Sequence, residues 1–434
     1  MYFRALREKI RKKKAIIAVV GLGYVGMPLL AQFYKKGFST IGIDIDKKKI
    51  LNLKKNKIRS FYFKNLFNKN KIKDLIFTSN FSNAERADVI ILCLPTPLKK
   101  NKSPDVSYIK KALEKLGPFL RKGQALSLES TTYPETTEEI LLPFLKKFKF
   151  NISKDYFLIY SPERESPVFE KNKNKFTLFN TPKICSGYSA NCLTIGNDLY
   201  SQIVKTVVKT DSTKKAEFAK MIENIYRAVN IGLINELKML SQKMNINIHQ
   251  VIDLAGTKPF GFTKFLPGPG LGGHCIPIDP YYLSWRAKKY KFETKFIRLA
   301  GDINQKVTNW TINNIIKIIK KKKINLKKCK ILILGVAYKA DIDDLRESPA
   351  LKIISFFKRK KINFDYCDPY INKIRHLNLK SIKFNYKNFK LYDCVVLLTD
   401  HSIFSRKKII NNSKLIVDTR GFLKNFNQSK IFHL

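Results

Sequence analysis

Short apolar runs that alternate with longer segments of helical periodicity are the main pattern of this chain. In the first half, six runs of this kind predict β-strands. They begin at Ala15 (AIIAVV), Ser39 (STIGID), Asp88 (DVIILCLP), Gln124 (QALSLES), Phe157 (FLIYSPE) and Thr181 (TPKICSG). Strands that alternate with helices favour a mostly parallel sheet with helices on both faces.

A second series of apolar runs follows a basic stretch at 320–330, which we interpret as a solvated helix end and linker. The runs begin at Lys330 (KILILGVAY), Asn363 (NFDYCDP), Asp393 (DCVVLLTD) and Lys414 (KLIVDTRG). The same alternation predicts a second α/β unit, so the two halves of the chain share a layout.

Between the two series, residues 216–244 have the periodicity of one helix, about 45 Å long at 1.5 Å per residue, which should connect domains. Lys220 and Asn224 lie four residues apart and therefore on one face. Either they face solvent, which is the commoner fate of such residues, or they line a cleft. The apolar pattern is also interrupted by Asn230, Asn235 and Glu236. These polar residues favour a partly buried polar face.

The first predicted strand leads into the turn Gly21-Leu22-Gly23-Tyr24-Val25-Gly26. In dinucleotide-binding proteins, glycines at this spacing allow a tight turn, the approach of a pyrophosphate and close helix packing. Asp44 ends the second strand about 20 residues downstream, where an acid binds the ribose 2′-hydroxyl. The motif predicts NAD, whereas the basic cluster 47–49 leaves NADP as the alternative.

Together these features predict an α/β fold of two Rossmann-like domains with doubly wound parallel sheets, joined by the long central helix and a helical domain. The predicted domains are residues 1–205, 206–325 and 326–434. The hydrophobic content of 44% is enough for an ordinary core in each domain.

The segment FLPGPGLGGHCIPIDPYY, which begins at Phe265, places Cys275 behind Gly272 and Gly273 in a loop stiffened by prolines. The missing side chains would let a substrate approach the sulfur, and a thiolate is a strong nucleophile. The loop therefore predicts a nucleophile for a carbonyl group. The alternative is a surface loop with an incidental cysteine, in which His274 only forms hydrogen bonds.

Composition adds one unusual feature, a formal net charge of +49. The lysines are spread over the whole chain, which is typical of an AT-rich coding bias. Nucleic-acid binding is the alternative, because basic charge is its electrostatic footprint, but no nucleic-acid-binding motif accompanies the charge. A positive field would also suit a substrate that carries phosphate groups.

The sequence argues against a membrane protein, because no apolar run approaches the roughly 18 residues that a spanning helix needs. Residues 11–14 are basic and precede an apolar run, but a secretory signal has no reason to encode the glycine pattern and the acid that follow. We therefore expect a cytoplasmic protein. The seven cysteines are scattered without metal-ligand spacing, so we expect neither a disulfide framework nor a metal site.

Seven blocks of the sequence resemble, in order, those of the UDP-glucose/GDP-mannose dehydrogenase family. They are GLGYVGMPL at Gly21, CLPTPL at Cys93, ESTTYPETT at Glu129, YSPER at Tyr160, AEFAKMIENIYRAVNIGLINEL at Ala216, PGPGLGGHCIPIDPYYL at Pro267 and GVAYKADIDDLRESPA at Gly335. The resemblance covers nearly the whole chain. It implies an NAD-binding domain, a central helical domain that builds a homodimer or larger oligomer, and a C-terminal domain for a nucleotide-sugar.

The resemblance implies a four-electron oxidation of a sugar C6 hydroxyl to a carboxylate with two NAD, in the synthesis of surface polysaccharide precursors. Cys275 would trap the intermediate aldehyde as a thiohemiacetal and then carry a thioester that water cleaves. Around the cysteine, the resemblance implies two oxyanion donors, Lys220 and Asn224, a general acid/base, Glu163, and two groups that hold water, Asp279 and Thr131.

The same matching implies two sets of binding residues. The positions that would contact NAD are Gly21, Gly23, Tyr24, Val25, Gly26, Asp44, Lys49, Thr96 and Arg346. The positions that would contact the nucleotide-sugar are Arg164, Phe265, Gly272, Lys339 and Arg420. Of these, Lys339 and Arg420 suit the phosphate groups of the substrate.

Within the family, the cysteine loop is most similar to that of bacterial UDP-N-acetylglucosamine 6-dehydrogenases, and Ile278 stands where UDP-glucose enzymes usually have a lysine. UDP-N-acetylglucosamine is therefore the expected substrate, with UDP-N-acetylmannosamine and UDP-glucose as alternatives. Three residues depart from the family pattern: Glu135 and Val168 replace glycines, and Ala340 replaces a lysine. A simpler alcohol dehydrogenase that stops at the aldehyde, and a nucleic-acid binder on a decayed dehydrogenase fold, are alternatives of other classes.

Overall fold

The structure is a computed structural model of the 434-residue chain, and it describes every residue except 56–73, 165–176 and 274–275. The chain divides into two compact units. Unit 1 comprises Met1–Glu223 and Tyr281–Phe292, and unit 2 comprises Asn224–Pro280 and Glu293–Leu434. The three-domain boundaries at residues 205 and 325 stay predictions.

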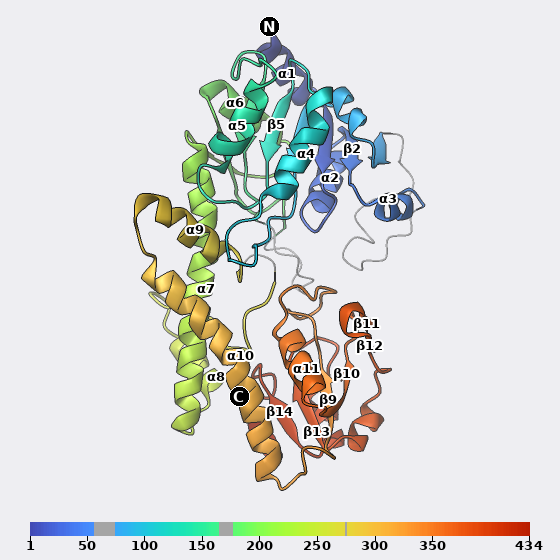
Figure 1. Cartoon of the computed structure of the whole chain (residues 1–434), viewed down its shortest axis with the longest axis vertical. Helices are drawn as coiled ribbons and strands as arrows, with labels where there is room; N and C mark the ends of the chain where they lie inside the picture. The colour runs from blue at the N-terminus through green and yellow to red at the C-terminus, as the bar shows by residue number, and fades with distance from the viewer. Residues whose placement is uncertain (56–73, 165–176, 274–275) are drawn as a thin grey trace. The chain divides into compact units, whose positions relative to one another are not determined.

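Unit 1 is built on an eight-stranded sheet of order β3-β2-β1-β4-β5-β6-β7-β8 (Figure 1). Its strands are β1 (Ile16–Val20), β2 (Ser39–Ile43), β3 (Leu75–Thr78), β4 (Val89–Leu92), β5 (Ala125–Leu128), β6 (Phe157–Tyr160), β7 (Lys183–Gly187) and β8 (Val207–Thr210). Neighbouring strands run parallel except β6 and β7. The six predicted strands are confirmed. The sequence missed the two edge strands, β3 and β8, because their partly exposed residues form only short apolar runs.

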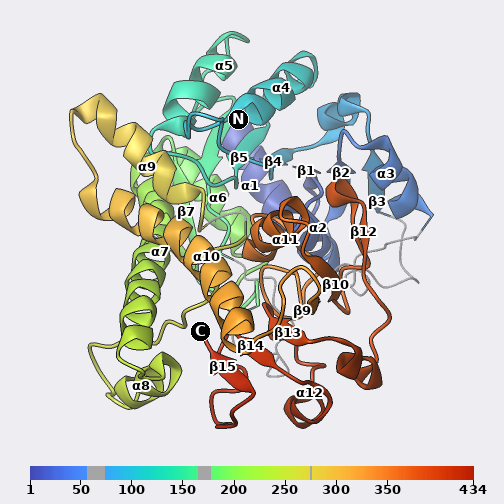
Figure 2. The same cartoon turned by 60° about the horizontal axis from the view of Figure 1, so that its bottom comes forward.

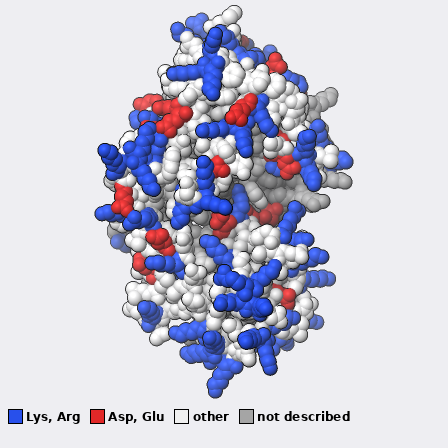
Figure 3. All heavy atoms as spheres, in the orientation of Figure 1, with Lys and Arg blue, Asp and Glu red and all other residues white. Residues whose placement is uncertain are grey.

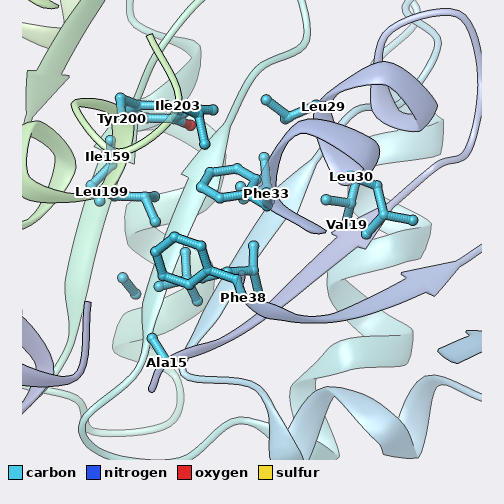
Figure 4. Close-up of a cluster of buried hydrophobic side chains, with 14 of the residues drawn as sticks. Ala15, Val19, Leu29, Leu30, Phe33, Phe38, Ile159, Leu199, Tyr200 and Ile203 are labelled. Carbon is cyan, nitrogen blue, oxygen red and sulfur yellow. The ribbon is translucent and has the colours of Figure 1, made fainter. Parts of the chain in front are cut away.

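Helices cover both the sheet and its edges in unit 1. They are α1 (Tyr2–Arg11), α2 (Gly26–Lys35), α3 (Lys47–Lys54), α4 (Ser107–Leu116), α5 (Leu142–Lys146) and α6 (Ala190–Tyr200). Figure 4 shows one core cluster, in which α2 presents its apolar residues to the sheet and to α6. There the rings of Phe33 and Phe38 meet edge to face with their centroids 5.7 Å apart.

Unit 2 contains a five-stranded parallel sheet of order β10-β9-β13-β14-β15. Its strands are β9 (Lys330–Leu334), β10 (Asn363–Cys367), β13 (Cys394–Leu397), β14 (Ile416–Asp418) and β15 (Ile431–His433), and a separate antiparallel pair is β11 (Lys373–Ile374) and β12 (Leu379–Lys380). Its helices are α8 (Ile248–Ala255), α10 (Lys295–Lys321), α11 (Pro349–Arg359) and α12 (Arg406–Asn412) (Figure 2). Two further helices, α7 (Thr213–Lys243) and α9 (Asp279–Ala287), cross the division between the units. The predicted α/β class, with a second parallel sheet and a long central helix, is confirmed.

The long helix α7 buries a row of polar residues and exposes a row of large apolar ones. The buried face includes Glu217, Lys220, Asn224, Asn235 and Lys238. The exposed face includes Ile222, Tyr226, Leu233, Leu237, Leu240 and Met244. Lys220 and Asn224 are therefore buried, which excludes the solvent-facing alternative that the sequence left open. Among the other polar residues, Asn235 is fully buried, whereas Asn230 is half-buried and Glu236 is exposed.

The first turn of each sheet has the same hydrogen-bonding pattern. In unit 1, Gly21 follows β1 with φ +95°, and Asp44 at the end of β2 accepts the N–H of the residue after this glycine at 2.9 Å. In unit 2, Gly335 follows β9 with φ +77°, and Asp368 at the end of β10 accepts the corresponding N–H at 2.6 Å. A carboxylate after the second strand thus holds the turn after the first strand in both units.

Charged side chains show no single basic stripe on the visible face of the molecule. Lysines and arginines are spread over both units, with acidic residues between them (Figure 3). The basic stretch at 320–330 is mostly exposed where α10 ends, as predicted. In the part of the chain that the structure describes, no helix is long and apolar enough to cross a membrane.

A comparison of Gly21 with Gly37 separates two costs of adding a side chain, the close contact and the strain of a positive φ. A Cβ at Gly21 would lie 2.3 Å from the carbonyl oxygen of Cys93, whereas at Gly37, with φ +91°, the nearest atom would be 4.0 Å away. Gly37→Ala should therefore cost only the left-handed strain, about 1–2 kcal/mol. We predict that Gly21→Ala lowers the free energy of unfolding by at least about twice as much, because main-chain atoms must move. Urea unfolding measures both losses, and equal losses would contradict the predicted contact.

Candidate functional site

The turn after β1 has the shape that a pyrophosphate requires. A Cβ at Gly26 would lie 1.9 Å from the carbonyl oxygen of Gly21, so only glycine lets α2 approach the turn this closely. A Cβ at Gly23 would meet nothing within 4 Å, so open space lies beside this residue. Tyr24 and Val25 complete the turn, and Val25 provides no side-chain cap for the first N–H groups of α2. These residues fit the diphosphate of NAD at a helix N-terminus.

The acid that follows β2 is paired with a predicted neighbour. Asp44 is buried, and its carboxylate accepts hydrogen bonds from the main-chain N–H groups of Leu22 and Asp46 at 2.9 and 3.0 Å. The same carboxylate accepts a hydrogen bond from the Lys49 ammonium group at 2.7 Å. Because this carboxylate neutralises Lys49, part of the basic cluster that could attract a 2′-phosphate is already engaged. The arrangement favours NAD over NADP.

The loops after β4 and β5 are joined at two predicted site residues. The Thr96 hydroxyl donates to the carbonyl oxygen of Thr131 at 2.9 Å. The carbonyl oxygen of Thr96 accepts a hydrogen bond from the Tyr282 hydroxyl on α9 at 2.5 Å. Thr96, predicted to contact NAD, and Thr131, predicted to hold water, therefore lie together.

A buried glutamate holds the turn that follows Thr131. The Glu217 carboxylate, on α7, accepts the N–H of Glu135 at 2.6 Å, the N–H of Thr137 at 2.9 Å and the Thr137 hydroxyl at 2.7 Å. Burial raises the pKa of Glu217 to about 8. Sequence reasoning missed this residue, although it lies three positions before Lys220 and therefore on the same face of the helix.

Glu135, which replaces a usual glycine, adopts the backbone conformation that glycine would favour. Its φ is +81°, and the side chain compensates by forming ion pairs. The carboxylate accepts hydrogen bonds from the Tyr290 hydroxyl at 2.6 Å and pairs with Lys214 at 2.9 Å, Lys289 at 3.3 Å and Arg286. Two other departures remain unexplained: Val168 lies outside the described residues, and nothing in the structure accounts for Ala340.

The YSPER segment after β6 is held by two lysines. Lys220, on α7, donates from its ammonium group to the main-chain carbonyl of Glu163. Lys183, at the start of β7, forms a fully buried ion pair with Glu129 at 2.6 Å and also reaches the Pro162 carbonyl at 3.4 Å. The structure therefore brings Lys220 and Glu163 together. The Lys183 to Glu129 ion pair was missed, because sequence does not reveal that a strand lysine is buried.

The remaining predicted site residue of unit 1 is Arg164. Its guanidinium donates to Glu223 at 2.8 Å and to the carbonyl oxygen of Pro182 at 2.7 Å. These contacts join the end of β6 to α7 and to the segment before β7. They fix the position of Arg164, the residue after Glu163.

In unit 2, Asn224 and Asp279 meet although they lie 55 residues apart in sequence. The Asn224 amide, on α7, donates to the carboxylate of Asp279, which is the first residue of α9. The amide oxygen of Asn224 accepts a hydrogen bond from Arg227, which fixes the orientation of the amide. Asn224 is fully buried and Asp279 is 2% exposed. Cys275, the predicted nucleophile, and His274 lie outside the described residues.

The glycine loop before the cysteine packs on the turn after β9. A Cβ at Gly272 would lie 2.6 Å from Cβ of Tyr338, and the N–H of Gly273 donates to the Arg346 carbonyl at 2.9 Å. Lys339, the next residue after Tyr338, is exposed. The structure thus places Gly272 beside the turn that carries Lys339.

Three more predicted binding residues lie in unit 2. Phe265 packs edge to face on Tyr226 with the ring centroids 5.6 Å apart. Arg420 donates to the carbonyl oxygen of Leu398 at 2.9 Å. Arg346 forms an ion pair with Asp344 at 2.7 Å, and it lies in unit 2, whereas the other predicted NAD contacts belong to unit 1.

Family models match this chain along most of its length. The UDP-glucose/GDP-mannose dehydrogenase family is matched by its NAD binding domain at residues 15–204, by its central domain at residues 214–306 and by its UDP binding domain at residues 332–425.

Individual relatives cover nearly the whole chain. The UDP-N-acetyl-D-glucosamine 6-dehydrogenase of Pseudomonas aeruginosa is 33% identical over 92% of this chain and 93% of its own. The UDP-N-acetyl-D-mannosamine dehydrogenase of Methanococcus vannielii is 31% identical over 96% of this chain and 94% of its own. Among solved structures, the UDP-D-ManNAc dehydrogenase of Pyrococcus horikoshii superposes with a TM-score of 0.85 at 28% identity, covering 96% of this chain and 98% of its own.

The left-handed conformation of Glu135 generates a stability test. Glu135→Ala loses the ion pairs and keeps the backbone strain, whereas Glu135→Gly loses the ion pairs and relieves the strain. We predict that the free energy of unfolding of the glycine variant is about 1–2 kcal/mol higher than that of the alanine variant. This is the reverse of the usual order of the two residues. Parallel urea titrations of the two variants measure the difference. A more stable alanine variant would show that residue 135 does not have a positive φ.

Proposed function

The chain belongs to the UDP-glucose/GDP-mannose dehydrogenase family, and we propose that it oxidises the C6 hydroxyl of a UDP-N-acetylhexosamine to the carboxylate with two NAD. The broader activity, that of an NAD-dependent UDP-sugar dehydrogenase, follows from family membership across the matched domains. The finer proposal rests on the relatives, whose sugars are N-acetylated.

The observation that carries the proposed mechanism is the pair formed by Asn224 and Asp279. Asp279 begins α9 four residues after Cys275, and Asn224 lies one helical turn after Lys220 on α7. The amide of Asn224 and the carboxylate of Asp279 are therefore joined at a residue four positions after the proposed nucleophile. An alcohol dehydrogenase that stops at the aldehyde has no need for this set.

The proposed reaction removes four electrons from the sugar carbon. NAD supplies the oxidising power, because each of two molecules accepts one hydride. The thiolate of Cys275 adds to the carbonyl carbon of the aldehyde, and the resulting thiohemiacetal keeps the aldehyde from escaping. After the second oxidation, water attacks the thioester, its oxygen enters the carboxylate and the thiol is released.

The described residues would act on charge and protons in these steps. The Lys220 ammonium group has donors beyond the one that it gives to the Glu163 carbonyl, and these suit the oxyanion of the thiohemiacetal. The Asn224 amide gives one N–H to Asp279 and leaves its second N–H for the same oxyanion. Asp279, held by Asn224, would orient water for thioester cleavage, and Glu163 would exchange the proton of the hydroxyl.

UDP-N-acetylglucosamine is the first candidate substrate, and UDP-N-acetylmannosamine is the second. The Pseudomonas aeruginosa relative supports the first, and the Methanococcus vannielii relative and the Pyrococcus horikoshii structure support the second. The two sugars differ only in configuration at C2. A pocket that accepts the acetamido group must therefore separate them by shape and hydrogen bonding.

We also propose that the enzyme is a homodimer joined through the exposed face of α7. The apolar residues of this face follow a heptad pattern, with Tyr226, Leu233 and Leu240 at one position and Leu237 and Met244 at the other. Asn230 occupies the same heptad position as Leu237 and Met244, and a single polar residue there sets the register of paired helices. A second copy of the chain covers such a stripe because the stripe is self-complementary.

The dimer proposal predicts that two glutamates on this stripe separate the protomers. Leu233→Glu combined with Leu240→Glu would place charges in the apolar seam, so we expect a monomer by light scattering coupled to gel filtration. Leu391→Glu is the control, because Leu391 is also exposed but lies outside α7. A wild-type monomer at micromolar concentration, or a dimer that survives the double substitution, would refute the interface.

The reaction is tested by following NADH with UDP-N-acetylglucosamine, UDP-N-acetylmannosamine, UDP-glucose and GDP-mannose. We expect two NADH per sugar for one N-acetylated substrate, and we expect Cys275→Ser to block completion because a hydroxyl is a poorer nucleophile than a thiolate. Cys192→Ser is the control, since this buried thiol accepts a hydrogen bond from the hydroxyl of Ser189, the N-cap of α6, and its replacement should leave the yield at two. One NADH per sugar in the wild-type enzyme would exclude the four-electron reaction.

A further inference from the structure

A lysine is buried in unit 2 beside a main-chain carbonyl. Lys238, on α7, is 1% exposed, and its ammonium group donates to the carbonyl oxygen of Gly268 at 3.1 Å. The same nitrogen lies 5.4 Å from the centroid of the Trp310 ring on α10. A carbonyl dipole and an aromatic face thus contact this cation, and in the described parts of the chain no carboxylate forms an ion pair with it. A buried lysine in such surroundings holds its proton weakly.

Arg420 is a second cation at the same peptide. Its hydrogen bonds go to the carbonyl oxygens of Leu398 at 2.9 Å and Tyr338 at 3.4 Å. A Cβ added to Gly268 would lie 2.7 Å from Nη1 of Arg420, so the guanidinium packs directly on this glycine. Lys238 and Arg420 therefore meet at Gly268, one at its carbonyl and one at its α-carbon.

Two carboxylates and two histidines lie near the two cations. They are Asp400, Asp418, His249 and His433. The Asp418 carboxylate is fully buried and accepts the main-chain N–H groups of Arg420 and Leu423 at 3.0 and 2.6 Å. Burial lowers the pKa of His249 to about 4, so its ring is neutral near pH 7.

These neighbours set the protonation of Lys238. Burial lowers the pKa of Lys238 to about 7, repulsion by Arg420 adds to this lowering, and attraction by Asp418 opposes it. In the free protein, Lys238 therefore loses its proton as the pH rises through the neutral range, whereas Arg420 stays charged.

The peptide that both cations contact belongs to the glycine loop of the site. The N–H of Gly268 donates to the side-chain oxygen of Asn235 at 3.1 Å, and Asn235 is held in turn by Asn304 at 2.9 Å. Asn235 and Lys238 lie on one face of α7 and bind the main-chain N–H and the carbonyl oxygen of Gly268, respectively. Gly268 lies four residues before Gly272, in the loop that leads to Cys275.

We propose that Lys238 is a positioning residue that holds the glycine loop against Arg420 and couples binding of the substrate's diphosphate to the uptake of a proton. This inference rests on the proposed function, in which Arg420 binds the phosphates of the UDP-sugar. A diphosphate carries two negative charges, and at Arg420 it would also lie near Lys238, because both cations contact the same glycine. The ligand favours the charged form of the lysine and therefore raises its affinity for the proton.

The proposal makes substrate affinity depend on pH. Below about pH 7 the lysine is already charged, and binding takes up no proton. Above this pH the free protein has lost the proton and the complex regains it, so the affinity falls by up to about tenfold per pH unit until the pKa of the complex is reached. Close to one proton is taken up on binding at about pH 8.

The experiment is calorimetric titration of the whole protein with UDP-N-acetylglucosamine and with UDP-N-acetylmannosamine in the absence of NAD, so that no turnover occurs. Each titration is run at about pH 6.5 and about pH 8, in two buffers of different ionisation enthalpy, which reveals the number of protons taken up. The diphosphate of either ligand has no group that titrates in this range, so uptake reports on the protein.

Three variants separate the roles of the lysine. Lys238→Arg keeps the charge at every pH, so we expect affinity without proton uptake and without a fall in affinity above pH 7. Lys238→Met removes the charge, so we expect affinity about tenfold weaker at pH 6.5 and the same absence of uptake. Lys243→Met is the matched control, because this exposed lysine of the same helix should leave both quantities unchanged.

The outcomes distinguish this inference from the proposed function. If the wild-type protein binds neither UDP-sugar, the proposed function fails. If it binds one of them without proton uptake at pH 8, or if Lys238→Arg retains the uptake, the role of Lys238 is refuted while the proposed function stands. Should Lys238→Met fail to fold by circular dichroism, the arginine variant alone decides the question.

Discussion

The buried polar face of α7 is the constraint on which the arrangement of the site depends. A buried donor or acceptor without a partner costs about 1–3 kcal/mol, so each polar residue of this face must bind a specific atom of a neighbouring segment. Glu217 binds the turn at 135–137, Lys220 binds the carbonyl of Glu163, and Asn224 binds Asp279. Further along the helix, Asn235 and Lys238 bind the Gly268 peptide. In each unit, the part of α7 that belongs to it thus holds the loops that carry the proposed catalytic groups of that unit.

The same constraint accounts for the apolar surface on the other side of α7. Polar groups that hold loops occupy much of the inward face, and many of the large apolar residues of the helix lie on its exposed face. The exposed apolar residues add little to the folding stability of an isolated chain, because burial of apolar surface is the main stabilising contribution to folding. The proposed partner helix on this face would recover that contribution. The polar interior and the proposed dimer are therefore two consequences of one helix orientation.

The two sheets hold the turn after their first strand in the same way. In each unit a glycine with positive φ ends the first strand, and an aspartate after the second strand holds the turn that follows. The surroundings of the two aspartates differ. Asp44 pairs with Lys49 near the surface, whereas Asp368 accepts from Nε2–H of the buried His401, whose Nδ1 accepts the N–H of Asp341. A common turn thus leaves one unit suited to NAD and the other to a UDP-sugar.

The sequence by itself determined the elements whose signals are local. Apolar runs identified the buried strands of both sheets, the glycine spacing and Asp44 identified the dinucleotide turn, and the order of the motifs identified the family. Glycine spacing is informative because backbone sterics act between near neighbours. Edge strands such as β3 and β8 escaped detection, since a strand exposed on one side needs no continuous apolar run.

Only the tertiary structure decided which face of α7 lies inside. Helical periodicity shows that Lys220, Asn224 and Lys238 lie on a different face from the leucines at 233, 237 and 240. It does not show which of the two faces is buried. That choice depends on hydrogen bonds to segments far away in sequence, such as the 55 residues that separate Asn224 from Asp279. The lowered pKa of Lys238 has the same origin, because it arises from burial and from Arg420, 182 positions away in the chain. Such long-range partners leave no periodic mark in the sequence.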